Sequence, residues 1–219
     1  MKISTEHEQL PDASDFAEIL APDLSAHATF NDRTLHFKAI CLPKLKLRSG
    51  QIIASDPYIL NGIPFTTRVP IGDHRLTLAI ALINTDERIA FAQVRFSTGL
   101  VTRWSMALVA GQDVSTLKPN YIFGYGVDSG TGCFADSEAY AEVTDASAED
   151  LSDRMMDESQ KVYRHTRDWL TVETAKGSMA LFSSGYGDGL YASYFGYSEK
   201  DELISLVTDF GLAKSNLIL

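Results

Sequence analysis

The sequence predicts a single α+β domain, built on a largely antiparallel β-sheet of meanders with two or three helices. Apolar and polar residues alternate with a period of two in several short runs, which is typical of half-buried strands. Turn-forming residues separate successive runs, so neighbouring strands are expected to pair antiparallel. The length of 219 residues suits one large domain.

The beginning of the chain is expected to be less regular than the rest. We expect residues 1–30 to form a peripheral N-terminal segment and residues 31–219 to form the α+β domain. Asp12 is placed to cap a short helix over residues 13–20. The run at residues 34–42 then alternates in part and predicts the first strand of the domain.

The middle of the chain has the clearest strand patterns. A turn at residues 48–51 and a short strand at 52–54 are predicted first. Residues 76–82 then alternate strictly, which predicts a half-buried strand. Two more strands are expected to follow and to complete an antiparallel meander, at residues 89–96 and 101–109.

The last third combines helices with strands. Asp136 is placed to cap a helix over residues 137–143, and a second helix is expected to run to about residue 165. Asp188-Gly189 suits a tight turn. This turn is expected to join the first two of three further strands, at residues 179–183, 190–197 and 203–210.

Charge and composition limit the possible partners. The formal net charge of −10 argues against a nucleic-acid partner, which needs a basic surface. Between residues 136 and 158, nine acidic residues accompany one basic residue, Arg154. This stretch predicts either a solvated helical face or a docking surface for a basic protein.

The sequence also predicts where in the cell the protein is located. No apolar run approaches the roughly 20 residues that cross a bilayer, so no membrane partner is expected. The N-terminus lacks the apolar region of a secretory signal, and the two cysteines form no CxxC motif. A reduced, cytoplasmic setting is therefore expected.

Two segments are rich in glycine, aspartate and aromatic residues: GYGVDSGTGCFAD at 124–136 and SGYGDGLYASYFGY at 184–197. We call them the Gly/Asp segments. They hold more than half of the chain's fifteen glycines. Glycine permits positive φ and the close approach of other groups. We therefore expect the Gly/Asp segments to meet near the end of the sheet and to form a candidate binding cleft.

These residues resemble a known family. The two Gly/Asp segments, LVTDFGL at 206–212, SGQIIASDP at 49–57 and FTTRVPIGDHRLTLAIA at 65–81 resemble a bacterial family known as domain of unknown function 4241. The resemblance spans roughly residues 49–212. Tyr186 is one departure, because the family more often has tryptophan there. The family name carries no activity, so the resemblance implies no catalytic residues.

Four carboxylates are candidates for holding a hard cation such as Mg²⁺ or Ca²⁺, which could activate water: Asp128, Asp136, Asp188 and Asp209. Structural roles are the competing interpretation. Asp136 can cap a helix, Asp188 can make a turn, and Asp209 can bond backbone amides. We predict no metal and no other cofactor.

The remaining candidates for the cleft carry similar alternatives. Cys133 is either a thiol activated by a helix N-terminus or a small buried side chain. Arg68 could pair with an aspartate of the Gly/Asp segments, or it could bind a carboxylate or phosphate ligand. Tyr125, Tyr186 and Tyr191 could line the cleft, or they could fill the core and the surface.

Two functions follow from these observations. The first is a non-catalytic binding protein, of the immunity type that neutralises a toxin, with the toxin as a basic protein partner. The acidic charge and the lack of a recognisable catalytic set favour it. The alternative is a metal-dependent hydrolase, or another small-molecule enzyme, that uses a cleft rich in glycine and aspartate.

Overall fold

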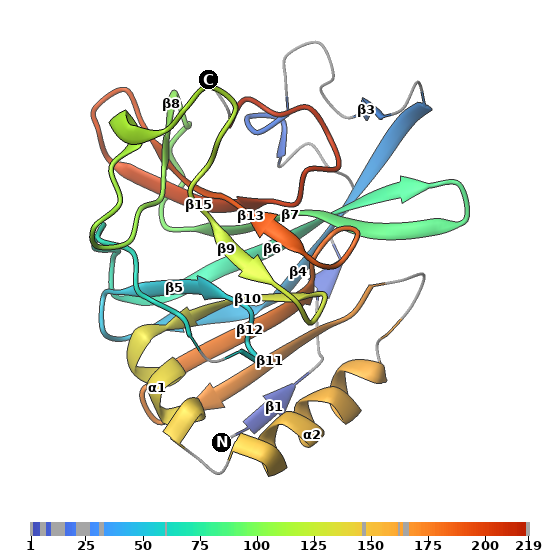
Figure 1. The fold of residues 1–219 in the computed structure, drawn as a ribbon, viewed down its shortest axis with the longest axis vertical. Helices are drawn as coiled ribbons and strands as arrows, with labels where there is room; N and C mark the ends of the chain where they lie inside the picture. Colours follow the sequence, from blue (N-terminus) through green and yellow to red (C-terminus); the bar gives the residue numbers. More distant parts are fainter. Residues whose placement is uncertain are drawn as a thin grey trace.

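The structure is a computed structural model that describes residues 2–4, 8–9, 16–20, 27–30, 33–59, 61–145, 148–161, 163 and 167–217. These residues form one β-rich domain of two stacked antiparallel sheets with two α-helices beneath the smaller one (Figure 1). The antiparallel sheet was predicted correctly. The α+β class is corrected, because strands dominate the described residues far more than that class implies.

The larger sheet has eight strands in the order β2-β4-β6-β7-β15-β14-β8, with β3 paired to β4. Its strands are β2 (Glu8–Gln9), β3 (His27–Phe30), β4 (Arg33–Leu47), β6 (Gly72–Ile83), β7 (Asp86–Arg95), β8 (Arg103–Met106), β14 (Ser193–Tyr197) and β15 (Leu203–Asp209). The ladder between β4 and β6 shifts register between Leu42 and Leu45. Pro43 lies at this shift. Proline has no N–H to donate to a neighbouring strand, so the hydrogen-bond ladder is interrupted there.

The smaller sheet has five strands in the order β1-β11-β12-β10-β5. These are β1 (Lys2–Ser4), β5 (Ile52–Ser55), β10 (Thr131–Asp136), β11 (Trp169–Thr174) and β12 (Gly177–Ser183). A separate two-stranded ribbon consists of β9 (Tyr125–Val127) and β13 (Gly189–Tyr191). A short 3-10 helix, η2 (Val114–Thr116), lies in the loop before β9.

The predicted meander is half correct. β6 and β7 pair as a hairpin, but the next neighbour of β7 is β15, and β8 pairs with β14 at the sheet edge. A central strand is covered on both faces, so most of its residues must be suited to burial. β15 is buried from Ile204 to Thr208, whereas no residue of β8 is buried. β15, which comes late in the chain, is therefore the strand inside the sheet, and β8 is at the edge.

β6 is also more buried than its alternation predicts. Every residue from Leu76 to Ala81 is buried, because both faces of the larger sheet are covered. Leu78 packs between the two sheets, and Ala79 and Ala81 pack against the outer layer. The small size of the alanines lets that outer layer lie close to the strand.

Three packed layers of side chains hold the domain together. The first lies between the sheets and includes Phe134, Phe182 and Leu206. The second lies under α1 (Ser137–Asp145) and α2 (Ala148–Gln160), which cover the smaller sheet with side chains such as Tyr140 and Met155 (Figure 1). The third lies on the outer face of the larger sheet. Neither helix has the length and apolar character of a membrane-spanning helix.

The described residues of the N-terminal segment pair with strands of both sheets and pack against the larger one. β1 pairs with β11, and β2 pairs with β4. Phe16 and Ile19 are fully buried in the third layer. Of the expected helix over residues 13–20, the structure describes residues 16–20: residue 16 lies in a 3-10 turn, and the amides of Ile19 and Leu20 donate to Phe16 O. Asp12 lies outside the described residues.

The predicted turn at Asp188-Gly189 does not join a hairpin. β12 pairs with β10 and with β11, a strand that the sequence analysis missed. β13 pairs instead with β9. The second helix ends at Gln160, about one turn before the predicted end.

Candidate functional site

The two Gly/Asp segments meet, as predicted. β9 belongs to the first and β13 to the second, and they pair with Tyr125 opposite Tyr191. The amide of Ser184 donates to Gly130 O at 3.0 Å, which ties the two turns together. The ribbon of β9 and β13 crosses between the sheets near their ends (Figure 1).

Glycine is required where the two segments touch. A Cβ added to Gly124 would lie 2.4 Å from Tyr191 O, a backbone atom that cannot turn away. Gly187 has a φ of 107°, which other residues rarely adopt. The glycines thus serve close packing and turn geometry at this contact.

Asp136 is a structural residue at the end of β10. One carboxylate oxygen accepts from the amides of Glu138 at 2.8 Å and Ala139 at 3.4 Å, which caps α1 as predicted. The other accepts from the amides of Arg48 at 2.7 Å and Ser49 at 2.8 Å, and from Ser49 Oγ at 2.9 Å. This fully buried carboxylate joins α1 to the turn before β5.

Asp56 plays the same part for the first Gly/Asp segment, and sequence reasoning missed it. It is fully buried and accepts from the amides of Asp128 at 3.0 Å and Ser129 at 2.8 Å. It also accepts from Ser129 Oγ and from the amide of Tyr58, both at 2.9 Å. The one indication in the sequence was that Asp56 directly follows the strand β5 and directly precedes Pro57.

The four candidate carboxylates do not form one metal site. Asp128 and Asp136 lie toward opposite ends of β10: Asp128 precedes the strand and Asp136 is its last residue, and the six residues of the strand extend roughly 16 Å. Asp128 and Asp188 are exposed on the turns of the ribbon. Asp209 accepts from the amide of Gly211 and from Ser215 Oγ, both at 2.8 Å. Among the described residues, no group of three or more potential metal ligands is found.

Cys133 is buried in β10 and does not lie at a helix N-terminus. Its Sγ lies 3.5 Å from Ser55 Oγ. Burial raises the pKa of the Cys133 thiol to about 12. The thiol is therefore protonated at neutral pH and is a poor nucleophile.

The other candidates have separate environments. Arg68 is exposed and donates to Ser49 O at 3.0 Å rather than to a carboxylate. Tyr186 is also exposed, and the Arg88 guanidinium lies over its ring at 4.5 Å. Tyr191 donates to Gly187 O at 2.7 Å, which braces the turn of the second Gly/Asp segment.

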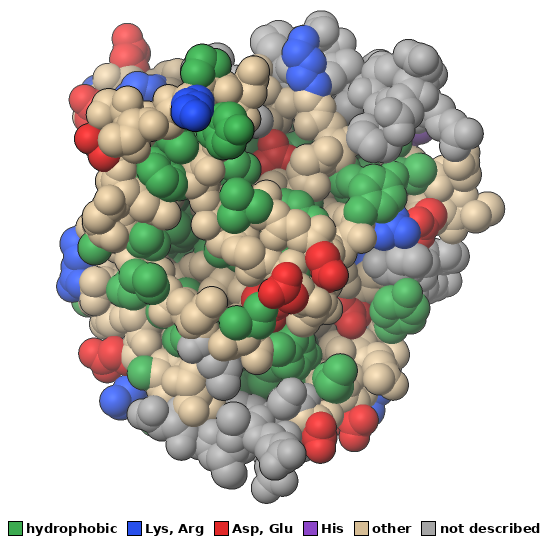
Figure 2. Space-filling model, viewed as in Figure 1, with side chains coloured by type: hydrophobic (Ala, Val, Ile, Leu, Met, Phe, Trp, Pro, Cys, Tyr) green, Lys and Arg blue, Asp and Glu red, His purple; other side chains and the backbone are tan. Residues whose placement is uncertain are grey.

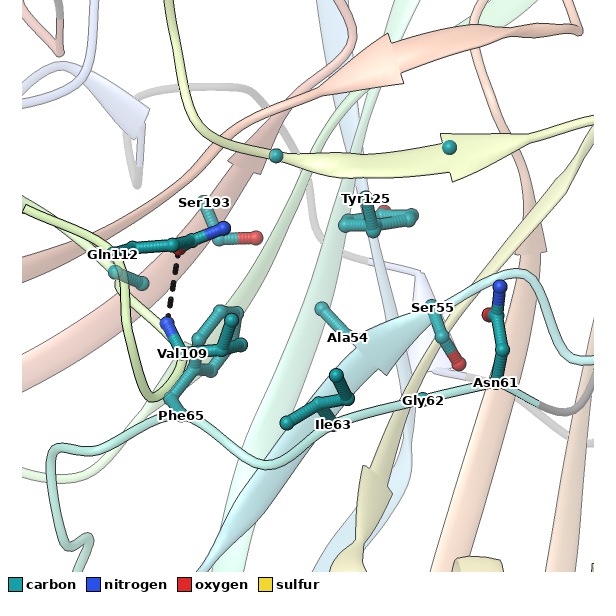
Figure 3. A pocket seen from close by; sticks show the side chains of 13 residues that line it. Ala54, Ser55, Asn61, Gly62, Ile63, Phe65, Val109, Gln112, Tyr125 and Ser193 are labelled. Carbon is teal, nitrogen blue, oxygen red and sulfur yellow. Dashed lines mark hydrogen bonds between the residues drawn. The ribbon is translucent and has the colours of Figure 1, made fainter. Parts of the chain in front are cut away.

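A cavity of about 220 Å³ lies between the ends of the two sheets, under β9 (Figure 3). We call it the inter-sheet pocket. Of the predicted site residues, only Tyr125 lines it. Burial raises the pKa of the Tyr125 hydroxyl. The pocket is lined by Ala54, Ser55, Asn61, Gly62, Ile63, Phe65, Ala107, Val109, Gln112, Gly124, Tyr125, Gly126 and Ser193.

Polar groups in the pocket wall are uncharged and partly fixed by the protein. Gln112 Oε1 accepts from the amide of Val109 at 3.0 Å. Ser193 Oγ lies 2.7 Å from Thr208 Oγ1. Sequence reasoning missed Ser55, Gln112 and Ser193, because each is an isolated polar residue whose position in the wall depends on how the sheets stack.

Hydrophobic side chains are exposed on the same face of the molecule. Figure 2 shows hydrophobic side chains over the face that carries β5, β9 and β13. Ile63 in the pocket wall is 55% exposed, and Leu190 in β13 is 54% exposed. Exposed apolar side chains beside a cavity supply contact area for a ligand or partner.

Comparison with known families gives one match. The sequence profile of the family described as "Protein of unknown function (DUF4241)" matches residues 45–208. The comparisons with curated proteins and with solved structures give no match. The matched range covers most of the chain and includes both Gly/Asp segments and every described lining residue of the inter-sheet pocket. The chain therefore belongs to the DUF4241 family.

Proposed function

We propose that this protein acts by binding, without catalysis, and that its partner is a basic protein. Our specific version is an immunity-type protein that neutralises a toxin in the cytoplasm. The main observation behind this proposal is the role of two carboxylates. Asp56 and Asp136 are buried and accept hydrogen bonds from turns of the protein itself.

This arrangement favours binding over hydrolysis. A metal-dependent hydrolase built on the predicted aspartates needs their oxygens at one ion, within about 2.6 Å for Ca²⁺. β10 instead separates Asp128 from Asp136, and the Cys133 thiol is buried. The described wall of the inter-sheet pocket is made of neutral polar and apolar groups, which orient a ligand without supplying an ionised acid or base.

The charge distribution supports a basic partner. The net charge is −10, and exposed acidic side chains on the helices include Glu138 on α1 and Asp153 and Asp157 on α2. Charges of one sign on one surface steer an oppositely charged partner and raise its association rate. The toxin as partner rests on this electrostatic argument and on analogy.

In the first step of the test, the chain is coexpressed with candidate basic toxins in a strain that the toxins kill. Where the strain survives, the chain and that toxin are purified. Charge reversal in Asp153→Lys/Asp157→Lys is then expected to slow association with the purified toxin about tenfold or more at low salt. Stopped-flow or surface plasmon resonance measures the rate. The loss is expected to shrink as salt rises, because the ions screen exposed charges.

Glu199→Lys/Glu202→Lys provides the matched control. Both residues are exposed in the turn before β15, and the change in net charge is the same. The control is expected to slow association much less than the helix variant. Equal effects of the two variants would show that the helices are not the docking surface. If coexpression rescues the strain from none of the toxins, the proposed immunity function is wrong.

A further inference from the structure

The inter-sheet pocket has features of a small-molecule site that are independent of any protein partner. We infer that it binds an uncharged aromatic carboxamide, a planar ring that carries a –CONH₂ group. Three properties of the pocket lead to this class of ligand: its volume, the neutrality of its wall, and the fixed orientation of Gln112. The inference does not rest on the proposed immunity function.

The volume sets the size of the ligand. An apolar cavity of about 150 Å³ is large enough to hold benzene. The inter-sheet pocket measures about 220 Å³, so it has room for one ring and a small polar substituent. Most drug-sized ligands need cavities of at least roughly 300 Å³ and are too large for it.

The wall sets the charge of the ligand. None of the thirteen described lining residues is ionisable in the physiological range. Transfer of an ion into such a wall costs free energy that no opposite charge returns. Apolar side chains, among them Phe65 and Val109, complete the wall. Phe65 is 6% exposed and meets Phe195 edge to face at 5.7 Å, so this part of the wall is rigid.

Gln112 selects an amide. Its Oε1 accepts from the amide of Val109, which turns the two N–H donors of the same side chain toward the rest of the pocket (Figure 3). These donors suit a carbonyl oxygen of the ligand. Figure 3 also shows the Gln112 nitrogen directed toward Ser193.

Hydroxyl groups in the wall suit the other half of a carboxamide. Among the described residues, Ser193 Oγ contacts Thr208 Oγ1, and Ser55 contacts Cys133 Sγ and the Tyr140 hydroxyl. A hydroxyl provides one donor and two acceptor positions, so both serines retain capacity to accept an N–H. A carboxamide supplies one acceptor and two donors in a neutral group, which matches the combination in this wall.

Three probes of the same shape test the inference on the whole chain of 219 residues. Benzamide is neutral, benzoate is its anionic counterpart, and benzamidine is cationic at neutral pH. In ¹H–¹⁵N NMR titrations at millimolar concentration, benzamide is expected to shift signals of Ala107, Val109 and Gly126. The two ions are expected to bind at least tenfold more weakly. Equal binding of the three probes, or no shift at these residues with benzamide, would overturn the inference.

The variant Gln112→Glu sharpens the test. A glutamate retains a side-chain oxygen for the Val109 amide but replaces the two donors with a negative charge. Benzamide is expected to bind about tenfold more weakly and benzamidine to bind more tightly than to the unmodified protein. Gln160→Glu, at the exposed end of α2, makes the same chemical change outside the pocket. If both variants leave the order of the probes unchanged, Gln112 does not select the ligand.

Discussion

At the scale of residues, the aspartates of this protein differ in how many hydrogen bonds they accept. Asp56 and Asp136 are fully buried, but each accepts four or more hydrogen bonds from backbone amides and hydroxyls. Asp209 is partly buried and accepts only two in the described structure. Burial outweighs these bonds and raises the pKa of Asp209 from 3.8 to about 6.

This shift gives a pH-dependent prediction. The raised pKa means that the folded state holds the Asp209 proton more tightly than the unfolded state. The contribution to stability is therefore present below about pH 4 and is lost as pH rises through about 6. Asp209→Asn preserves an acceptor for the Gly211 amide and can donate to Ser215 Oγ. It is expected to stabilise the protein by about 1–2 kcal/mol at pH 7.5, because it removes a partly buried charge.

Urea unfolding of both proteins at several pH values measures this difference. The advantage of Asp209→Asn is expected to shrink toward zero between pH 6 and pH 4, where the wild-type carboxyl becomes protonated in the folded state. Asp128→Asn, at an exposed carboxylate, is expected to show no such trend. An Asp209→Asn advantage that stays constant with pH would contradict the prediction.

Individual residues were predictable only where their contacts are local. The cap that Asp136 forms on α1 follows from its position directly before the helix. Its bonds to Arg48 and Ser49 reach back 88 and 87 residues, and no pattern in the sequence predicts them. Asp56 was missed for a similar reason, because its partners Asp128 and Ser129 lie 72 and 73 residues later, in the first Gly/Asp segment.

At the scale of elements, the ribbon of β9 and β13 is the part that the glycines shape. Gly124 lies where β9 enters the ribbon and its backbone touches Tyr191. Gly126 lies two residues later, and a Cβ there would meet nothing within 4 Å. Both residues contribute to the wall of the inter-sheet pocket. The glycine just before β9 and the glycine within it thus differ in how closely the protein packs against them.

This difference predicts contrasting effects of the same substitution. Gly124→Ala places a Cβ 2.4 Å from a backbone oxygen, so β9 must move away from β13. The expected cost is about 1–3 kcal/mol of unfolding free energy. Gly126→Ala is expected to leave stability within about 0.5 kcal/mol of the wild type. Denaturant unfolding measures both variants, and equal effects would show that the contact with Tyr191 does not constrain β9.

Elements with a strong local pattern were predicted, but their partners were not. The alternation in β6 and β7 and the turn between them gave the hairpin correctly. β11 pairs with β12 across a two-residue turn, but its sequence WLTVET lacks a clear alternation, and we missed it. The position of β15 beside β7 depends on burial of both faces of the strand, which local alternation does not reveal.

At the scale of the whole molecule, the core between the sheets joins distant parts of the chain. Phe134 and Phe182 of the smaller sheet pack with Leu78 and Leu206 of the larger sheet in one cluster. Neither sheet can lose this contact without exposing apolar surface of the other. Residues that lie on both sheets also build the inter-sheet pocket, so its shape depends on the stacking of the sheets.

This shared core predicts that the chain unfolds as one cooperative unit. The two tryptophans report on different layers: Trp169 lies in the core between the sheets, and Trp104 packs on the outer face of the larger sheet. We expect Trp104→Phe and Trp169→Phe each to unfold with the same urea midpoint by fluorescence and by far-UV circular dichroism. The midpoints of the two variants can differ, since each removes a different packed ring. Within one variant, a fluorescence midpoint that departs from the dichroism midpoint would mean that the layers unfold separately.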